Sequence, residues 1–229
     1  MRRPAARPLL PAAGRPLAVA IVVVCALVTA VQGVWLRHGM ETGRVNVAVD
    51  AKILAALAGH PVLLATLVWL GEPMPVTAMT AALVLACVLR RRYSQAALVA
   101  ISVPAAAALT EFVLKPRIGR TPWGDPFPSG HVTSMAALAT ALTVLLVTTP
   151  VRMPGLMRAV LAVTAFVIAA AVAFGVIGAK MHHFTDSVGG AAVGAGTVLA
   201  TALILDLLGV RLDAAVSRGS LPFAVGSGP

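Results

Sequence analysis

The sequence has few charged and few aromatic residues for its length. Of its 229 residues, only 11% are charged and 4% aromatic, whereas 59% are hydrophobic. Roughly a quarter of the residues in a soluble domain are charged, because water must hydrate the surface. The composition therefore argues against a soluble protein and favours a chain whose outer surface faces lipid. The shortage of aromatic rings also argues against a nucleic-acid surface, where bases stack on such rings.

Cysteine is scarce as well. Cys25 and Cys87 both lie within apolar stretches, so we expect buried free thiols and no disulfide framework. No four residues have the spacing of a zinc site, so neither a structural metal nor a cofactor is expected. The formal net charge of +10 comes from short basic clusters between apolar stretches. This pattern favours membrane lipids and phosphate over nucleic acid as partners.

Six apolar stretches approach the length of about 20 residues that a membrane helix needs. We predict transmembrane helices at roughly 17–36, 73–90, 95–114, 131–149, 159–180 and 187–208. Residues 61–70 are apolar but too few to span, and 45–58 alternate as an amphipathic helix does. We expect 45–70 to form surface or re-entrant helices on the outer face. The predicted fold is an all-α, polytopic membrane bundle of about six spans.

The placement of arginine predicts the orientation of these spans. With six spans, the basic clusters before the first span and after the second, fourth and sixth fall on one side, which is cytoplasmic by the positive-inside rule. We expect an integral plasma (inner) membrane protein with a disordered basic head (1–16), a six-span domain (17–210) and a flexible tail (211–229), both termini being cytoplasmic. The first span could instead be a signal peptide, given its basic start and a Val28-Thr29-Ala30 stretch.

Two segments on the predicted outer side have the features of an anion site. Lys115, Arg117 and Arg120 lie within six positions of one another, against the positive-inside tendency, and a bound anion would explain them. The next segment is Pro128-Ser129-Gly130-His131, at the start of the fourth span. Its serine is a suitable helix N-cap, its glycine permits close backbone approach, and a helix N-terminus favours phosphate.

A third segment lies at the junction of the fifth and sixth spans. His182 and Asp186 are four residues apart and would share one face of a helix. A carboxylate there can accept one imidazole N–H, fix the tautomer and leave the other nitrogen free to attack. The pair of His183 and Asp186, three apart, is the second choice. All three segments end on the same side of the membrane, where we predict a phosphate-processing site.

These residues resemble the type 2 phosphatidic acid phosphatase superfamily, which includes lipid phosphate phosphatases and vanadium haloperoxidases. The resemblance covers roughly 45–208 and is strongest in Phe-Pro-Ser-Gly-His (127–131), in 182–186 and in the six-span layout. It implies a helical membrane bundle that hydrolyses lipid phosphates without a metal, through a phosphohistidine.

The resemblance also implies a role for each site residue. His182 would attack phosphorus, His131 would protonate the leaving oxygen and later activate water, and Asp186 would orient His182. The phosphate oxygens would be bound by Lys115, by Ser129 and by the backbone N–H of Gly130.

Two positions depart from the pattern of that family. Where its first motif has an arginine, seven positions after the lysine, this chain has Pro122, and the nearest arginine is Arg120. Where its third motif has an arginine, six positions before the nucleophilic histidine, this chain has Val176. The missing charge would have to come from elsewhere, with Arg120 preferred among Arg117, Arg120 and Lys180.

The expected function is hydrolysis of a lipid phosphate at the outer membrane face, with a polyprenyl phosphate or diphosphate as the preferred substrate. Phosphatidate or phosphatidylglycerophosphate is the alternative substrate. A non-catalytic phospholipid-binding protein of the same fold is the other alternative, motivated by the missing arginines. The sequence gives no indication of the oligomeric state.

Overall fold

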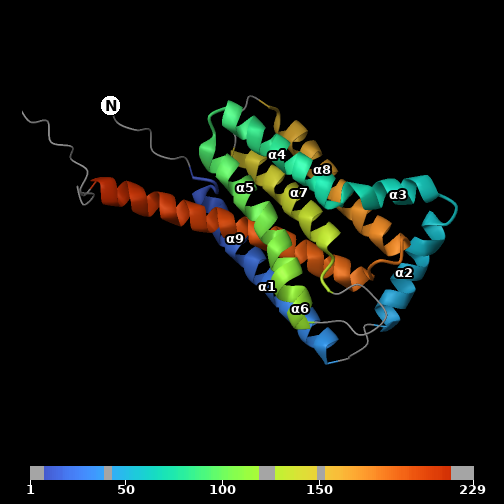
Figure 1. Ribbon diagram of the computed structural model, residues 1–229. Helices are drawn as coiled ribbons and strands as arrows, with labels where there is room; N and C mark the ends of the chain where they lie inside the picture. Colours follow the sequence, from blue (N-terminus) through green and yellow to red (C-terminus); the bar gives the residue numbers. More distant parts are fainter. Residues whose placement is uncertain (1–7, 39–42, 119–126, 149–152, 218–229) are drawn as a thin grey trace, which may run out of the picture.

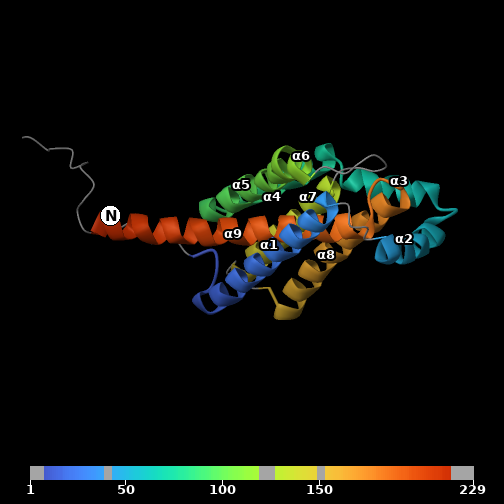
Figure 2. The same ribbon diagram turned by 90° about the horizontal axis from the view of Figure 1, so that it is seen from below.

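In the computed structural model, residues 8–38, 43–118, 127–148 and 153–217 are described, and every element within them is a helix. A short 3₁₀ helix (Ala12–Gly14) leads into the long helix α1 (Arg15–Arg37). The other long helices are α5 (Tyr93–Ala108), α7 (Gly130–Thr148), α8 (Gly155–Gly178) and α9 (Phe184–Ser217). Helix α4 (Pro73–Leu89) precedes α5, and α2 (Gly43–Leu57) and α3 (Pro61–Leu70) lie at one end of the bundle (Figures 1 and 2). The expectation of an all-α bundle is confirmed.

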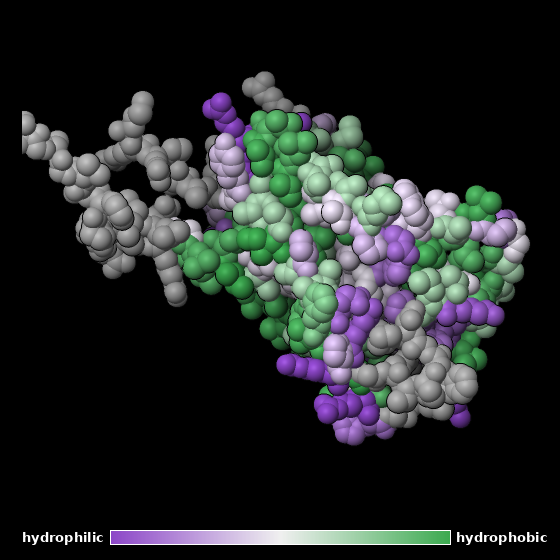
Figure 3. Space-filling model, in the orientation of Figure 1, coloured by the Kyte–Doolittle hydropathy of each residue, from purple (hydrophilic) through white to green (hydrophobic). Residues whose placement is uncertain are grey.

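Five helical stretches are long and apolar enough to cross a membrane: Ala12–Arg37, Tyr93–Ile118, Gly130–Thr148, Gly155–Gly178 and Phe184–Gly209. The remaining predicted span corresponds to α4, which is apolar but has only 17 residues. Helices α2 and α3 are bent by 119° at their junction, as in a broken span or a re-entrant loop, and counting them as one span gives six. Figure 3 shows wide apolar areas on the outer surface, as expected where lipid is the solvent.

Helix α7 forms the centre of the bundle. It packs against α5, α8 and α9, and 67% of its apolar stretch is buried. Close packing with α9 depends on two glycines of that helix: a β-carbon on Gly190 would lie 2.6 Å from the Ser129 carbonyl oxygen, and one on Gly194 would overlap the Thr133 carbonyl oxygen. Small residues at this spacing let the backbones of membrane helices approach closely.

The third predicted span is one continuous helical stretch with an irregular centre. Pro104 lies inside α5, where it removes a backbone donor, and a π-helical turn (η2, Leu109–Leu114) follows. The chain then continues as the short helix α6 (Lys115–Ile118). An inserted π-turn changes the direction of the side chains that come after it, and such turns are frequent at functional sites. Here the predicted anion-binding segment begins directly after the turn, at Lys115.

The segment before α1 lies against the second half of α9. Asp206, which is buried in α9, accepts hydrogen bonds from the backbone N–H groups of Leu9 (2.6 Å) and Leu10 (3.0 Å). It also forms an ion pair with Arg15 (3.4 Å). The segment before α1 therefore contacts α9 through Leu9 and Leu10, and the start of α1 does so through Arg15. Helix α9 continues to Ser217, into the predicted flexible tail.

Candidate active site

The residues of all three predicted segments meet at one end of a groove of about 710 Å³ between α4 and α5. Four of them form its polar end, namely Lys115, Gly130, His131 and His182, together with Glu111 of the π-turn. The rest of the groove follows α4 and α5 into the bundle and is mostly apolar, with lining residues such as Val76, Val84, Val103 and Pro104. The site therefore joins a compact polar end to a long apolar channel.

The turn between α8 and α9 positions His182. Helix α8 ends at Gly178, and Lys180 takes a left-handed conformation with φ of 59°. The Val176 carbonyl oxygen then accepts the backbone N–H groups of Met181 (3.0 Å) and His182 (3.3 Å). This arrangement brings the buried His182 side chain to the polar end of the groove.

His182 lies opposite a fully buried carboxylate. Its Nδ1 atom is 3.7 Å from Asp186 Oδ2, slightly beyond hydrogen-bond distance. The same carboxylate oxygen accepts the backbone N–H of His183 at 2.9 Å, which holds it against the turn. With Nδ1 directed towards Asp186, the other ring nitrogen of His182 is the one available to a ligand.

Helix α2 fixes this turn from outside. Asp50 accepts the Phe184 backbone N–H (3.0 Å) and lies 2.6 Å from His183 Nδ1. Asn46 accepts the Thr185 backbone N–H at 3.1 Å. Two residues of α2 thus cap the otherwise free N–H groups at the start of α9.

This capping also separates the roles of the two adjacent histidines. His183 is half exposed, bound to Asp50 and outside the groove, whereas His182 is buried and lines the groove. The geometry therefore favours the pair of His182 and Asp186 over the pair of His183 and Asp186. Asp50 lies in the segment 45–58 that the sequence predicts as an amphipathic helix, but its contact with the turn was not predicted.

His131, the second residue of α7, has a carboxylate partner that sequence reasoning also missed. Its Nε2 atom lies 3.4 Å from Oε1 of Glu72, the residue directly before α4. The preceding Gly71 lies against the imidazole, because a β-carbon there would be 3.0 Å from Cβ and Cδ2 of His131. The sequence contained one signal for this contact: Glu72 is an acidic residue at the start of the predicted span 73–90, on the same side of the membrane as the histidines.

Lys115 is paired inside the groove. Its Nζ atom lies 2.6 Å from Oε1 of Glu111, one turn earlier. The Glu111 carboxylate lies directly against Gly130, where any side chain at position 130 would overlap it. A carboxylate therefore occupies the space beside the N-terminus of α7, which is where the sequence predicts that an anion binds.

Ser129 connects two of the predicted segments. Its backbone N–H donates to the carbonyl oxygen of Asp186 (3.1 Å), and its own carbonyl oxygen accepts the Thr133 hydroxyl (2.8 Å). The Ser129 hydroxyl lies 3.5 Å from the Val132 backbone nitrogen, as in an N-cap. Ser129 is fully buried and holds the start of α7 against the start of α9, beside the groove and not in its lining.

The structure does not bring the other predicted cations to this groove. Arg117 lines a different groove on the opposite side of α6, and Lys180 is exposed in the turn. Arg120 and Pro122 lie outside the described residues. Position 176 is occupied by a valine that is fully buried within the bundle, and it therefore supplies no charge to the groove. Among the described residues that line the active groove, Lys115 is the one permanent cation.

A comparison with protein families matches this region of the chain. The family model described as the PAP2 superfamily matches residues 109–208, from the π-turn to the middle of α9. The match therefore includes Lys115, both groove histidines and Asp186. No curated protein and no solved structure matches the sequence. Among the described residues, no three metal-binding side chains are grouped as a metal site requires.

Proposed function

Because residues 109–208 belong to the PAP2 superfamily, we propose that this membrane protein is a phosphatase that hydrolyses a lipid phosphate in the groove between α4 and α5. The observation that carries the proposal is the composition of that groove. Two histidines and a lysine lie at one end, and an apolar channel leads away from them. A phosphate head group and its lipid tail would require this combination.

In the proposed reaction, His182 is the nucleophile. Its free ring nitrogen attacks phosphorus, the bond between phosphorus and the lipid oxygen breaks, and His131 gives its proton to that oxygen. The resulting phosphohistidine is then attacked by water, whose proton passes to His131, and inorganic phosphate leaves. Asp186 holds the proton-bearing Nδ1 side of His182 and stabilises the positive ring, as an orienting carboxylate does in a triad.

Phosphate binding would draw on the helix N-terminus as well as on Lys115. The first backbone N–H groups of α7 have no partner within the helix and carry a positive partial charge, and the absence of a side chain at Gly130 lets an anionic oxygen approach them, as Glu111 does. These fixed donors would stabilise the charge that develops on the phosphate oxygens. A dianion binding there would displace the Glu111 carboxylate from Lys115.

The apolar channel supports a substrate with a long chain. Along α4 it runs from Pro73 to Val84, about 16 Å at the helical rise of 1.5 Å per residue. One continuous groove accommodates one extended chain, so we propose a single-chain polyprenyl phosphate or diphosphate as the substrate class. Phosphatidate or phosphatidylglycerophosphate, with a second chain left in the bilayer, is the alternative.

We also propose that the active end faces the outside of the plasma membrane. At the opposite end of the bundle, a small pocket gathers Arg90, Arg92 and Arg158. Arginines concentrated at one end of the bundle support a cytoplasmic location for that end, by the positive-inside rule. The histidine end would then lie at the outer leaflet, with both termini inside.

The test is phosphate release by purified protein, with a chelator present, from four lipids: a polyprenyl diphosphate, a polyprenyl phosphate, phosphatidate and phosphatidylglycerophosphate. Chelator-resistant release that disappears in His182→Ala is expected. The matched control is His60→Ala, because His60 is exposed and lies outside the groove. Release that persists in His182→Ala would refute the assignment of the nucleophile.

A second candidate function is phospholipid binding without catalysis. The observation in its favour is the charge of the groove, where Glu111 already neutralises Lys115 and Val176 stands at a position where the family has an arginine. Under this hypothesis the folded protein would bind lipid phosphates but release no phosphate from any of the four. The same assay therefore separates the two functions.

A further inference from the structure

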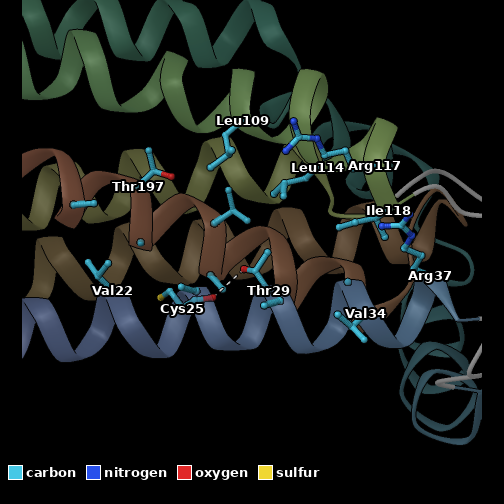
Figure 4. A pocket seen from close by; sticks show the side chains of 17 residues that line it. Val22, Cys25, Thr29, Val34, Arg37, Leu109, Leu114, Arg117, Ile118 and Thr197 are labelled. Atoms are coloured by element: carbon cyan, nitrogen blue, oxygen red, sulfur yellow. Dashed lines mark hydrogen bonds between the residues drawn. The ribbon is translucent and has the colours of Figure 1, made fainter.

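A second groove, of about 500 Å³, lies between α1, α9 and the η2–α6 segment (Figure 4). Helix α1 lines it from Val22 to Arg37, which is about 22 Å along the helix axis. Its floor on α9 is made of small residues, among them Ala192, Gly196 and Ala200. The dimensions fit one extended hydrocarbon chain.

This groove is separate from the active groove, although both border the same segment. Glu111 and Lys115 face the active groove, whereas Leu114, Arg117 and Ile118 face the second one. The η2–α6 segment therefore forms a wall between two cavities. A ligand in the second groove does not contact His131 or His182.

Two arginines lie at one end of the second groove. Figure 4 shows Arg37 and Arg117 beside Leu114 and Ile118, with Val22 and Thr197 towards the other end. Both arginine side chains are exposed, and no ion pair to either is found among the described residues. No acidic residue belongs to the described lining of the groove. Two guanidinium groups at the end of an apolar groove are complementary to an anionic head group with a tail.

The body of the groove offers no competing polar site. The Thr29 hydroxyl is already used, because it donates to the Cys25 carbonyl oxygen at 2.9 Å. Two glycines that line the groove let its walls approach closely, since a β-carbon on Gly33 of α1 would be 2.9 Å from Ile118 and one on Gly196 of α9 would be 3.0 Å from Cys25 of α1. An apolar chain suits these walls, and a polar ligand would leave its polar groups unsatisfied.

We propose that the second groove binds a phospholipid with an anionic head group, whose phosphate is held between Arg37 and Arg117 and one of whose chains lies along α1 and α9. This site is additional to the proposed catalytic groove. Because Arg117 is two residues from Lys115, a head group that joins α1 to α6 would also hold the wall of the active groove in place.

The test uses phosphatidylglycerol with a photoreactive group in one acyl chain, incorporated into vesicles with the full-length protein. As a phosphodiester it lacks the terminal phosphate that the catalytic groove would hydrolyse. Mass spectrometry of the labelled peptides then identifies the helices contacted. We expect labelling of α1 between Val22 and Val34 and of α9 between Ala192 and Ala200. A phosphatidylcholine probe with the same chains should label these peptides roughly tenfold less, equivalent to about 1.4 kcal/mol.

Variants separate the head-group contact from general contact with lipid. In the double variant Arg37→Gln, Arg117→Gln, labelling of α1 and α9 by phosphatidylglycerol should fall to the phosphatidylcholine level. The control is Arg44→Gln, an exposed arginine on α2 outside the groove. A second variant, Ala26→Phe, fills the groove without altering its charge and should also reduce the labelling.

Two results would overturn the proposal: equal labelling by both probes in the wild-type protein, or unchanged labelling in the double variant. Either would mean that the groove only contacts bulk bilayer lipid. Phosphate release is measured separately. Head-group-selective labelling without phosphate release would refute the proposed function alone, and phosphate release with non-selective labelling would refute only the second lipid site.

Discussion

Replacing Asp50 by alanine tests whether α2 holds the catalytic turn in place. Asp50 accepts the Phe184 backbone N–H and lies 2.6 Å from Nδ1 of His183. His183 directly follows His182 in the sequence. Loss of a helix cap costs about 1 kcal/mol. A hydrogen bond to a charged group contributes about 1.5–3 kcal/mol, and we take about 1 kcal/mol here because the His183 side chain is half exposed. The total, about 2 kcal/mol, corresponds to a roughly 30-fold change in the equilibrium that keeps the turn closed.

Two measurements report this change. Hydrogen exchange of the amides of residues 183–185 should accelerate in Asp50→Ala, by up to about 30-fold. Turnover of the best lipid phosphate should fall by about 10-fold or more, because His182 and Asp186 lose their fixed relation. Asp50→Asn should be intermediate, since it keeps one acceptor oxygen for the Phe184 N–H and loses the charge.

Lys52→Ala is the matched control, because Lys52 lies on the same helix and is exposed. Exchange of these amides at the wild-type rate in Asp50→Ala would show that Asp50 does not hold the turn. Faster exchange together with unchanged turnover would show instead that the cap stabilises the turn but does not position the nucleophile.

Two further predictions concern other carboxylates. Glu72→Gln should lower kcat by up to about fivefold, because the carboxylate 3.4 Å from His131 Nε2 is replaced by a neutral amide; the effect is small since Glu72 is partly exposed. Steady-state kinetics would measure it, and an unchanged kcat would remove Glu72 from the mechanism. Asp206→Ala should destabilise the contact between the N-terminal segment and α9 by about 1–3 kcal/mol, because the Leu9 and Leu10 N–H groups lose their acceptor. Limited proteolysis before residue 15 should then be faster, and an unchanged cleavage rate would contradict this role.

Much of the fold could be predicted because its signals are local. The apolar stretches at 17–36, 131–149 and 159–180 correspond to α1, α7 and α8 within a few residues. The π-turn at Leu109–Leu114 could not be predicted in this way, since it depends on how the segment after Pro104 packs and not on composition. For the same reason, the predicted end at 114 missed α6, where polar residues continue the helix.

The site could be predicted to the extent that spacing within one helix or turn defines it. The separation of His182 and Asp186 is such a case, and the structure places the pair face to face. The contacts of Asp50 with His183 and of Glu72 with His131 join residues 133 and 59 positions apart, so spacing could not define either pair, and the sequence indicated only that Glu72 lies on the side of the histidines. For Arg117, a local pattern was misleading. Its proximity to Lys115 in the sequence suggested a shared site, yet the helix directs the two side chains into different grooves.

The charge of the active groove implies where substrate affinity must come from. A phosphate at the start of α7 has to replace the Glu111 carboxylate, which already lies 2.6 Å from Lys115. The free energy of breaking that pair is subtracted from the affinity for the head group, and Arg117 is directed elsewhere. The lipid tail compensates through the bilayer, because each methylene contributes about 0.8 kcal/mol to partitioning into the membrane and so concentrates the head group beside the groove. A long chain therefore offsets the lost ion pair, whereas a soluble phosphate ester has nothing to offset it. The same groove that binds its head group weakly should thus select strongly for long-chain lipid phosphates.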